Sequence, residues 1–416
     1  MSLLLFEDDQ AARLAPATLL RPAFVVACGG SRLIDRLAEL DLPVRSFTRP
    51  HLEASVAVDF PANHSADAAD PWSVFVNARL VPSAAVLAEL RRLVAEGRAG
   101  IVSDGDAVAA AVVAVDTFPA GVPKPHDKIA GALHALKLPR LDADLPLLEY
   151  PHDIIRYHLE TLDDNLQQFV NAGDYRQTED GVFLARDVDI GSHVVFDTDR
   201  GPVVVERGTS IGPHSFLSGP VRLGPHATVV DHARIRGHVA AGHATKLGGE
   251  ISCSVIEPYT NKSHHGFLGH SYLGSWVNLG AGTTNSNLKN TYGMVRMTYG
   301  GQKIDTGMQF MGCVVGDYCK TAINSSIFTG KTIGAWSTLY GFVTENIPSL
   351  VNYARQFGEV KEVSVEVARQ MQARAFDRRG LTPRPCDVVL IESLAELTRD
   401  ERRQFDPDMR CGPLKF

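Results

Sequence analysis

A six-residue repeat in the second half of the chain restricts the possible folds more than any other feature. From residue 205 onward the sequence divides into VERGTS, IGPHSF, LSGPVR, LGPHAT, VVDHAR and IRGHVA. The first residue of every block is aliphatic: Val205, Ile211, Leu217, Leu223, Val229 and Ile235. An α-helix repeats about every 3.6 residues and a strand about every 2, so neither explains a period of six. The pattern predicts a parallel β-helix in which each short strand places one aliphatic side chain in the interior.

The repeat continues towards the C-terminus with two interruptions. Its phase shifts by two residues between Ile235 and Val255, which indicates an irregular coil. It also passes a polar segment around 285–310 and resumes at Val315. Because Val315 follows Leu279 by a whole number of six-residue blocks, we expect that segment to leave the β-helix as a loop and to return in register.

The flanking sequence predicts two further units in this chain of 416 residues. Before about residue 175, short apolar runs alternate with helical patterns at 31–40 and 83–96, which is typical of an α/β domain. The apolar runs are 3–6, 24–27, 74–76 and 109–115. A helix at 151–170 is expected to join this domain to the β-helix, and helical patterns return at 355–378 and 389–404. We therefore expect an α/β domain at 1–175, a β-helix at 176–347 and a helical C-terminal tail at 348–416.

Composition and charge argue against several classes of protein. The formal net charge is −7, which is unfavourable for a nucleic-acid partner held by a general basic field. No run of about 18 uncharged apolar residues is present, so we expect no membrane-spanning helix and no membrane partner. The acidic Glu7, Asp8 and Asp9 do not fit a signal peptide, and the six cysteines form no C-x-x-C pair. These features predict a cytoplasmic protein with reduced thiols.

Four histidines occupy the fourth position of blocks in the repeat: His214, His226, His232 and His238. We interpret this position as an exposed turn of the β-helix. If three blocks make one coil, His214 and His232 lie over one another, because they are three blocks apart. No carboxylate or cysteine at fixed spacing completes a metal site around them, so we predict none.

A polar segment at 261–293 is the strongest candidate for a functional site. It contains His264, His265, His270, Asn278, Asn285, Asn287, Lys289 and Asn290. A hydrophobic core needs no such set, whereas loops on a rigid scaffold often carry binding residues. A neutral histidine is a suitable general base near pH 7, and backbone N–H groups of residues 280–282 can polarise a carbonyl oxygen. The segment therefore predicts a site that combines a general base with donors able to polarise a carbonyl oxygen.

The repeat and this segment resemble the GlmU-like family, in which a sugar nucleotidyltransferase domain is fused to a left-handed β-helix with acyltransferase activity. The family motifs are K-A-G-H-x-x-Y-L-G and N-x-N-I-G-A-G-T, and this chain has KSHHGFLG followed by VNLGAGT. The resemblance implies that His264 is the catalytic base, that Asn278 and Asn287 contact substrate, and that the Ala281 N–H stabilises the oxyanion. It further implies acetyl-CoA or another acyl-CoA as co-substrate, and a homotrimer with sites between subunits.

Several departures from the family concern the binding of a sugar phosphate. The family tyrosine is Phe267, an asparagine–tyrosine pair becomes Asn287-Leu288, and a phosphate-binding lysine becomes Ser252. Arg236 is the residue that keeps a phosphate contact, and Lys289 is a further substrate-binding candidate. Losing several charge-assisted donors, each worth roughly 1.5–3 kcal/mol, weakens binding of a sugar 1-phosphate. The acceptor is therefore left open.

The N-terminal part of the chain resembles the sugar nucleotidyltransferase half less closely. The family opens with A-A-G-x-G-T-R, and this chain has ACGGSR at 27–32, one residue shorter. The metal-binding N-G-D of the family corresponds to Asn77-Ala78-Arg79, and an arginine cannot bind Mg²⁺. Other candidates for nucleotide or Mg²⁺ binding are Asp8, Asp9, Arg13, Arg21, Gly29 and Gly30. In the alternative interpretation Asp8 and Asp9 only end a strand.

The sequence thus predicts a transferase of nucleotide-sugar metabolism, with acyl transfer at His264 better preserved than nucleotidyl transfer. Two alternatives remain open. The protein is either a trimeric scaffold or sensor that binds a nucleotide sugar without turnover, or a nucleotidyltransferase whose β-helix serves assembly. In each case the ligand is a nucleotide sugar or sugar phosphate, and Mg²⁺ is needed only if the N-terminal domain is active.

Overall fold

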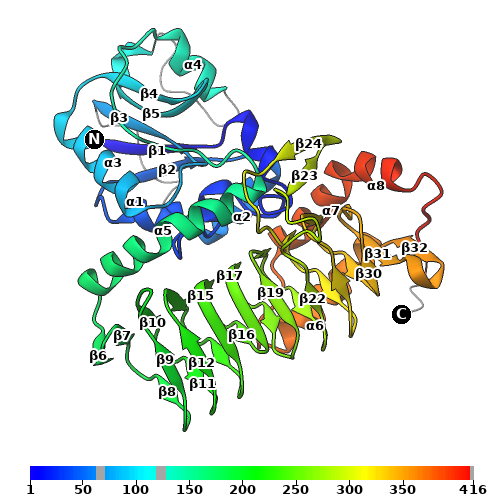
Figure 1. Cartoon of the computed structure of the whole chain (residues 1–416). Helices are drawn as coiled ribbons and strands as arrows, with labels where there is room; N and C mark the ends of the chain where they lie inside the picture. Colours follow the sequence, from blue (N-terminus) through cyan, green and yellow to red (C-terminus); the bar gives the residue numbers. More distant parts are fainter. Residues whose placement is uncertain (62–70, 119–127, 413–416) are drawn as a thin grey trace.

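The computed structural model describes residues 1–61, 71–118 and 128–412. An α/β domain lies along one side of a long parallel β-helix, and helices from the C-terminal part pack along its C-terminal half (Figure 1). This arrangement confirms the fold class expected from the repeat. No helix in the described ranges is long and apolar enough to cross a membrane.

The N-terminal domain is built on a five-stranded sheet in the order β2-β1-β3-β5-β4. Its strands are β1 (Ser2–Phe6), β2 (Val44–Phe47), β3 (Trp72–Asn77), β4 (Gly100–Asp104) and β5 (Ala107–Ala114). Its helices are α1 (Leu33–Ala38), α2 (Glu53–Asp59), α3 (Ala84–Glu96) and α4 (Ile129–Ala135). Strand β1 runs parallel to both β2 and β3, whereas β5 is antiparallel to β3 and β4. The carboxyl ends of β1 and β3 are therefore adjacent, at a point where the strand order reverses.

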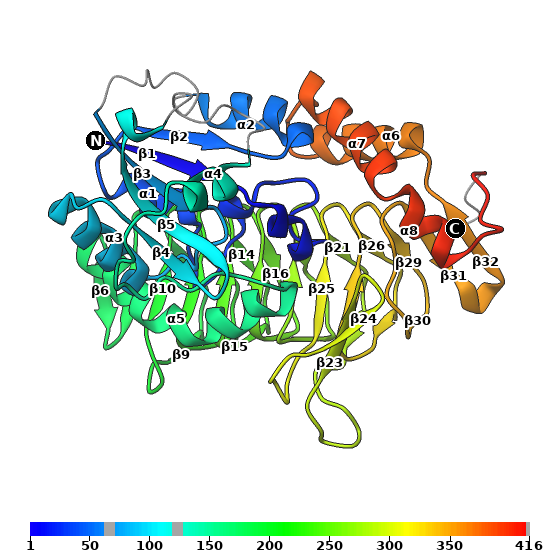
Figure 2. The ribbon, with the colours of Figure 1, turned by 90° about the horizontal axis from the view of Figure 1, so that it is seen from above.

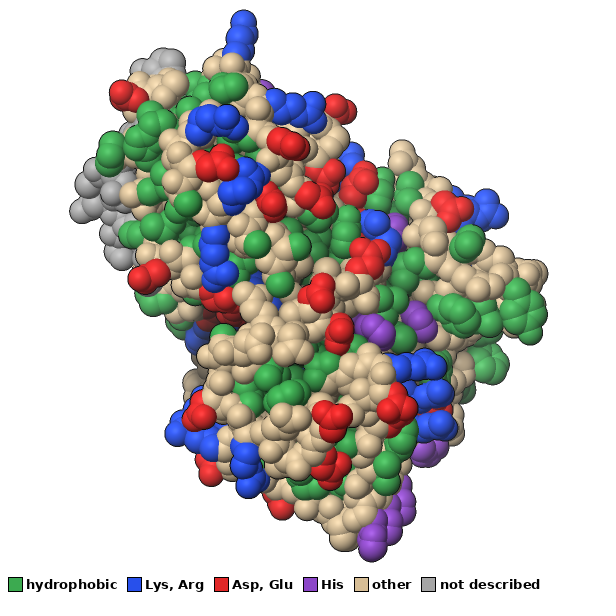
Figure 3. All heavy atoms as spheres, turned by 60° about the vertical axis from the view of Figure 1, so that its left-hand side comes forward, with side chains coloured by type: hydrophobic (Ala, Val, Ile, Leu, Met, Phe, Trp, Pro, Cys, Tyr) green, Lys and Arg blue, Asp and Glu red, His purple; other side chains and the backbone are tan. Residues whose placement is uncertain are grey.

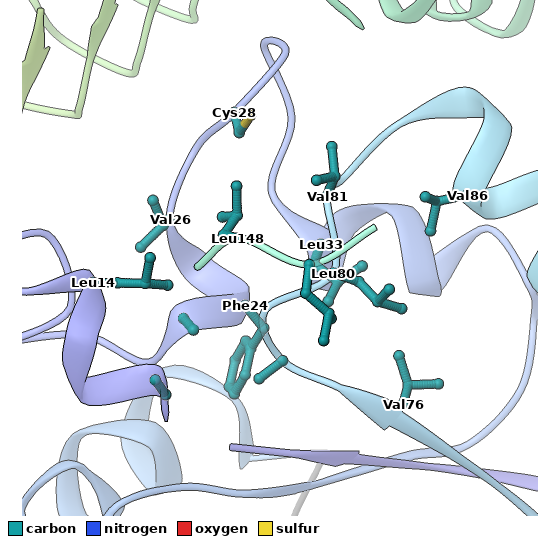
Figure 4. Close-up of a cluster of buried hydrophobic side chains, with 14 of the residues drawn as sticks. Leu14, Phe24, Val26, Cys28, Leu33, Val76, Leu80, Val81, Val86 and Leu148 are labelled. Atoms are coloured by element: carbon teal, nitrogen blue, oxygen red, sulfur yellow. The ribbon is translucent and has the colours of Figure 1, made fainter. Parts of the chain in front are cut away.

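The apolar run at 24–27 is not a strand, contrary to the expectation from its composition. It contains a short 3-10 helix, Ala23–Val25, and leads into a tight turn closed by Cys28 and Ser31. Phe24, Val26 and Cys28 are buried in the domain core (Figure 4). A short apolar run has no periodicity that distinguishes a strand from another buried segment, which explains the error.

Helix α5 (Pro151–Ala172) joins the two domains and confirms the predicted connecting helix. Its buried Leu162 and Leu166 pack against Val204 and Ala240 of the β-helix. His158 on the same helix lies 2.9 Å from the His238 carbonyl oxygen through its Nε2. The helix thus forms part of the contact between the domains.

Each coil of the β-helix contributes strands to three faces. The first face consists of β7 (Val182–Leu184), β10 (Val203–Val205), β13 (Val221–Leu223), β20 (Tyr272–Leu273), β25 (Cys313–Val315) and β28 (Lys331–Ile333). The second face consists of β8 (Asp189–Ile190), β11 (Ser210–Ile211), β14 (Thr228–Val229), β16 (Lys246–Leu247), β18 (Asn261–Lys262), β21 (Asn278–Leu279), β26 (Lys320–Thr321), β29 (Thr338–Leu339) and β31 (Val351–Ala354). The third face consists of β9 (Val195–Asp197), β12 (Phe216–Ser218), β19 (Phe267–Gly269), β22 (Thr284–Asn285), β27 (Ser326–Ile327) and β30 (Phe342–Val343). Strands β15 (Arg234–Ala241) and β17 (Glu250–Ile256) turn from the third face into the first.

The coil length follows the predicted repeat. Ser210 pairs with Thr228, and Thr228 pairs with Lys246, so each of these coils spans three blocks of the repeat. Lys246 then pairs with Asn261, so the next coil is shorter than three blocks. This short coil is the irregular stretch that the shift in phase predicted. The aliphatic residues at the first position of each block lie in the interior of the β-helix, as expected.

The polar segment after β22 leaves the β-helix, as predicted. Asn278 pairs with Lys320, so the coil that begins at Asn278 contains a long insertion. Part of the insertion is an antiparallel hairpin of β23 (Arg296–Tyr299) and β24 (Gln302–Asp305). Figure 2 shows this hairpin on one side of the β-helix and the C-terminal helices on the other.

The C-terminal region begins with strands rather than a helix. β31 pairs in parallel with β29 and antiparallel with β32 (Glu359–Glu362) across a turn at Gly358. The hairpin continues the second face at the end of the β-helix, a role that the charged sequence pattern did not reveal. Three helices follow: α6 (Val365–Asp377), α7 (Pro385–Leu397) and α8 (Arg399–Phe405).

Candidate functional site

The turn between the second and third faces of the β-helix carries the stacked histidines and, further along, the candidate catalytic base His264. One position in this turn adopts positive φ in successive coils, and His193, His214 and His232 occupy it at 56–58°. The rings of His214 and His193 stack with centroids 4.9 Å apart, and those of His214 and His232 at 5.1 Å. The predicted stack is therefore confirmed, and Figure 3 shows histidine side chains gathered along the lower edge of the molecule.

The loop that contains His264 lies at the same corner, directly beyond the short coil. In that coil two glycines, Gly248 and Gly249, link β16 to β17. A Cβ on Gly248 would lie 2.2 Å from the Ser263 carbonyl oxygen, and one on Gly249 would lie 2.9 Å from that of His264. Only glycine leaves room for the backbone of the His264 loop at this distance, so the short turn determines where the loop lies.

A buried lysine fixes the loop from inside the β-helix. Lys262 is 1% exposed and occupies the interior column that holds Leu247 in the preceding coil. Its Nζ donates to the Gly248 carbonyl oxygen at 2.9 Å and also to the His264 carbonyl oxygen. Burial lowers the pKa of Lys262 to about 8. The lysine thus ties the short glycine turn to the backbone of His264.

His264 and Asn278 line one groove between the second face and helix α6. The groove has a volume of about 450 Å³, within the range of small-molecule sites. Its floor includes Asn261 and Asn278, whose side-chain amides lie 3.4 Å apart. Trp276 stacks on Tyr259 at one side, with ring centroids 4.4 Å apart. The structure therefore brings together a histidine, two amides and an aromatic pair.

The predicted oxyanion donor, the backbone N–H of Ala281, lies in the turn after β21. Among the described residues it donates no hydrogen bond, whereas the next N–H, that of Gly282, donates to the His265 carbonyl oxygen at 3.1 Å. An earlier coil has Pro213 at the same turn position. Proline has no N–H, so this turn forms without a hydrogen bond from the residue at that position. The hydrogen bond from Gly282 ties the Ala281 turn to the His264 loop.

The other candidates of the β-helix lie away from this groove. Asn287 lies 2.9 Å from His270 Nδ1 through its Nδ2, and burial lowers the pKa of His270 to about 4. Lys289 lines a separate cavity of about 660 Å³ beside β22 and β27. Arg236 on β15 forms an exposed ion pair with Glu250 at 3.3 Å. Within one chain, the structure does not join these residues to His264.

Asp8 is engaged by an arginine of its own domain. Arg79, only 1% exposed, donates from Nε to Asp8 Oδ1 at 2.8 Å and from Nη2 to Oδ2 at 2.6 Å. Asn77 adds a third hydrogen bond at 2.9 Å. Burial alone would raise the pKa of Asp8, but these donors hold it below its ordinary value. The pair bridges the carboxyl ends of β1 and β3, the place where open α/β sheets bind ligands.

Gly29 and Gly30 form a closed turn rather than an open phosphate loop. Both residues adopt positive φ, and the backbones of Cys28 and Ser31 hydrogen-bond to each other in both directions. A Cβ on Gly29 would lie 2.3 Å from the Thr161 hydroxyl of α5. Because both glycines are buried, their N–H groups do not face a ligand crevice.

The remaining N-terminal candidates are distributed over three places. Arg21 is buried between the domains, where it pairs with Glu257 at 3.0 Å and with Asp317. Arg13 forms an ion pair with Glu149 at the surface, at 3.6 Å. Asp9 is exposed and lies 3.8 Å from Lys128, beside a cavity of about 470 Å³.

The carboxylates at the adjacent ends of β1 and β3 do not fit a Mg²⁺ site. This ion requires free carboxylate oxygens, and both oxygens of Asp8 already accept hydrogen bonds from Arg79. Glu7 is likewise engaged by Arg49, through Nε at 3.1 Å. The described residues contain no group of three or more His, Cys, Asp or Glu side chains that could hold a metal ion.

The sequence reasoning missed a set of basic residues in the His264 groove. These are Lys246, Lys320, Arg374, Arg378 and Arg379. The three arginines are distant from His264 in sequence and lie on or directly after α6. Their spacing along one face of a helix was the available signal, but only the position of α6 shows which surface they face.

The N-terminal domain matches a known family by sequence. Residues 3–172 match the family model described as sugar nucleotidyl transferase. The match covers the α/β domain and the connecting helix, and the parallel β-helix follows directly. This order of domains is GlmU-like, which confirms the resemblance drawn from the motifs.

Curated relatives are named as bifunctional proteins, and the name of one of them states both activities. A bifunctional sugar-1-phosphate nucleotidylyltransferase/acetyltransferase of Sulfurisphaera tokodaii is 28% identical over 143 residues, 34% of this chain and 36% of the relative. A bifunctional protein GlmU of Synechococcus elongatus is 28% identical over 201 residues, 43% of this chain and 40% of the relative. The chain thus spans less than half the length of these relatives.

Solved structures of acyltransferases align with part of the chain. The UDP-N-acetylglucosamine acyltransferase of Francisella novicida aligns with a TM-score of 0.27 and 13% identity, covering 54% of this chain and 76% of that one.

Proposed function

We propose that this protein is an acyltransferase of nucleotide-sugar metabolism that transfers an acyl group from acyl-CoA at the groove of His264. The observation that carries the proposal is the groove itself, which His264 and Asn278 line together. The Ala281 N–H, in the turn after β21, donates to no acceptor among the described residues. The name of the Sulfurisphaera tokodaii relative, a sugar-1-phosphate nucleotidylyltransferase/acetyltransferase, agrees with this class of reaction.

In the proposed reaction His264 removes a proton from an amine or hydroxyl of the acceptor. The acceptor then attacks the thioester carbonyl carbon, and the developing oxyanion accepts a hydrogen bond from the Ala281 N–H. The carbon–sulfur bond breaks, and the CoA thiolate takes up the proton. Asn278 orients the acceptor, and Lys262 holds the His264 backbone.

The experiment measures acyl transfer from acetyl-CoA to a panel of amino-sugar nucleotides. The reaction is monitored through the free CoA thiol that it releases. We expect His264→Ala to lower the rate by about 10²–10⁴-fold, the usual contribution of a general base. His265→Ala, next to it on the exposed loop, is the control and should retain activity. An unchanged rate in His264→Ala with an intact melting transition would contradict the assignment.

A second candidate function is a non-catalytic nucleotide-sugar scaffold or sensor. The Asp8–Arg79 pair of the N-terminal domain favours it, because Arg79 engages both carboxylate oxygens that a catalytic Mg²⁺ would require. The same pair argues against nucleotidyl transfer as the sole activity. Nucleotide-sugar binding without CoA release by any tested acceptor would support the scaffold.

We further propose that the chain forms a homotrimer through the third face. Phe328 and Phe342, on and beside β27 and β30, are 47% and 52% exposed. Asn287 and Lys289 lie on the side of the third face and not in the His264 groove. In a trimer, Asn287 and Lys289 of one subunit would complete the His264 groove of its neighbour.

A further inference from the structure

The groove of His264 has a strongly basic lining. Lys246 and Lys320 come from the second face of the β-helix. Arg374, Arg378 and Arg379 come from α6 and the residues directly after it. The lining contains no aspartate or glutamate. The protein as a whole has a net charge of −7, so this groove differs from the rest of the molecule in its concentration of positive charge.

These cations lack the carboxylate partners that arginines have elsewhere in the molecule. Across the described residues, none of the five takes part in an ion pair, whereas Arg21, Arg49 and Arg79 are all paired with buried carboxylates. Burial lowers the pKa of Lys320, and the positive charge of Arg378 adds to this effect. Like charges that face each other repel, so an anion bound between them stabilises the arrangement.

The arginines of the groove differ in whether their guanidinium groups already form hydrogen bonds within the protein. Arg379 is fixed by hydrogen bonds from its Nη2 to Asn261 Oδ1 at 3.0 Å and to the Ala244 carbonyl oxygen at 3.2 Å. Arg374 on α6 and Arg378 at its C-cap are exposed, and they lie one helical turn apart on the same side. Two guanidinium groups at this spacing suit two adjacent phosphates, because each presents a planar fork of donors.

We propose that this groove binds the diphosphate group of a substrate, with Arg374 and Arg378 as its principal ligands and Lys320 and Arg379 completing the site. The assignment of the ligand to acyl transfer rests on the proposed function, whereas the binding of diphosphate does not. The diphosphate belongs either to acyl-CoA or to a nucleotide-sugar acceptor.

The test is isothermal titration calorimetry with CoA, UDP-N-acetylglucosamine and inorganic pyrophosphate as separate probes. We expect the wild type to bind CoA or the nucleotide sugar, and which of the two it binds identifies the source of the diphosphate. The double variant Arg374→Met/Arg378→Met should weaken that binding at least tenfold. Arg369→Met, on the exposed part of α6 outside the groove, is the matched control and should bind as the wild type does.

Two further measurements keep the outcomes distinct. If the double variant does not fold, Lys320→Gln should weaken binding instead, and wild-type binding should weaken as ionic strength rises from about 50 to about 300 mM. The proposal is overturned if the wild type binds neither organic diphosphate, or if the double variant binds as tightly as the wild type. A His264→Ala variant that binds normally and still transfers the acyl group refutes the proposed function alone.

Discussion

At the scale of single residues, several polar groups are buried for reasons that the sequence does not state. His158, Lys262 and Arg79 lie in the interior, and each hydrogen-bonds to a backbone carbonyl oxygen. A buried polar group is costly unless it has such a partner, so each of these residues fixes two segments of backbone relative to each other. Their contributions can be tested separately.

The first prediction concerns His158. Burial lowers its pKa to about 4, well below the value of about 6.5 in an unfolded chain. Between these values the unfolded chain binds a proton that the folded chain does not, so stability falls as pH decreases from about 6.5 towards 4. We expect His158→Gln to lose less stability over that interval, measured from urea midpoints at pH 7 and pH 5. Replacement of the exposed His193 by Gln should leave the wild-type slope, and equal slopes for His158→Gln would contradict the argument.

The second prediction concerns Lys262. Its replacement by methionine removes the hydrogen bonds to the Gly248 and His264 carbonyl oxygens and leaves the His264 loop without support from the interior. We expect Lys262→Met to lower the acyl-transfer rate at least tenfold through kcat, while the affinity for CoA stays close to that of the wild type. The control is Leu247→Met, at the same interior column one coil earlier. A fall in affinity alone would point to a different role for the lysine.

At the scale of elements, the two domains are joined by a buried polar network. Arg21 pairs with Glu257 and Asp317, and Glu257 also accepts hydrogen bonds from the Ala27 N–H at 2.9 Å and the Tyr272 hydroxyl at 3.0 Å. The coulombic attraction of the two carboxylates raises the pKa of Arg21, against the effect of its burial. This network connects the segment after β1 to the first face of the β-helix.

The third prediction follows from that network. Arg21→Met leaves two buried carboxylates without a counter-charge, and breaking a buried pair in this way typically costs about 3–5 kcal/mol. We expect a loss of stability of that order in chemical denaturation. Arg13→Met is the matched control, because its surface pair with Glu149 is expected to contribute at most about 1 kcal/mol. Similar losses in both variants would show that burial of the Arg21 pair is not the cause.

The elements also show how far the sequence can be interpreted on its own. The β-helix, its short coil and its insertion follow from the six-residue period, because interior packing requires an aliphatic residue once per strand. The hairpin of β31 and β32 was missed because its charged residues resemble a helical pattern. The basic lining of the groove was missed because Arg374 and Arg378 line the same groove as His264 only through the packing of α6, which no local pattern encodes.

The same limit applies to the nucleotide-site candidates. Gly29 and Gly30 resemble a phosphate loop in sequence, but a phosphate loop must follow a strand and open onto a crevice. Here the glycines follow a 3-10 helix and face α5. Asp8 follows β1 and caps the 3-10 helix Asp9–Leu14. Its partner Arg79 was recognisable in the sequence as the arginine at the position of a metal ligand in the resembling family.

At the scale of the whole molecule, the fourth prediction concerns assembly. If the third face forms the subunit interface, analytical ultracentrifugation should give about three times the chain mass of 45.1 kDa. Phe342→Asp places a charge within the exposed apolar patch and should shift the population to the monomer. Val58→Asp, at an exposed apolar residue of α2 far from this face, should leave the trimer intact. A monomeric wild type at micromolar concentration would refute the proposed interface.

The fifth prediction concerns the N-terminal domain. Because Arg79 and Arg49 already occupy the carboxylates at the strand ends, we expect no release of pyrophosphate from any of the four nucleoside triphosphates with sugar 1-phosphates and Mg²⁺. Thermal-shift measurements with the same nucleotides report binding independently of turnover. Pyrophosphate release at a rate well above the buffer control would show that the domain is an active nucleotidyltransferase.

The outward-facing row of residues on the first face of the β-helix gives the N-terminal domain a structural role that does not depend on catalysis. Ala240, Val255, Tyr272 and Val314 follow one another along that row, and all of them are buried. Three of them, Val255, Tyr272 and Val314, belong to the hydrophobic core of the N-terminal domain itself. Removing the domain would therefore expose a continuous apolar stripe and leave Glu257 without its arginine. A gene shortened to the β-helix alone should yield an aggregating product, so loss of catalysis in the first domain would not make that domain dispensable.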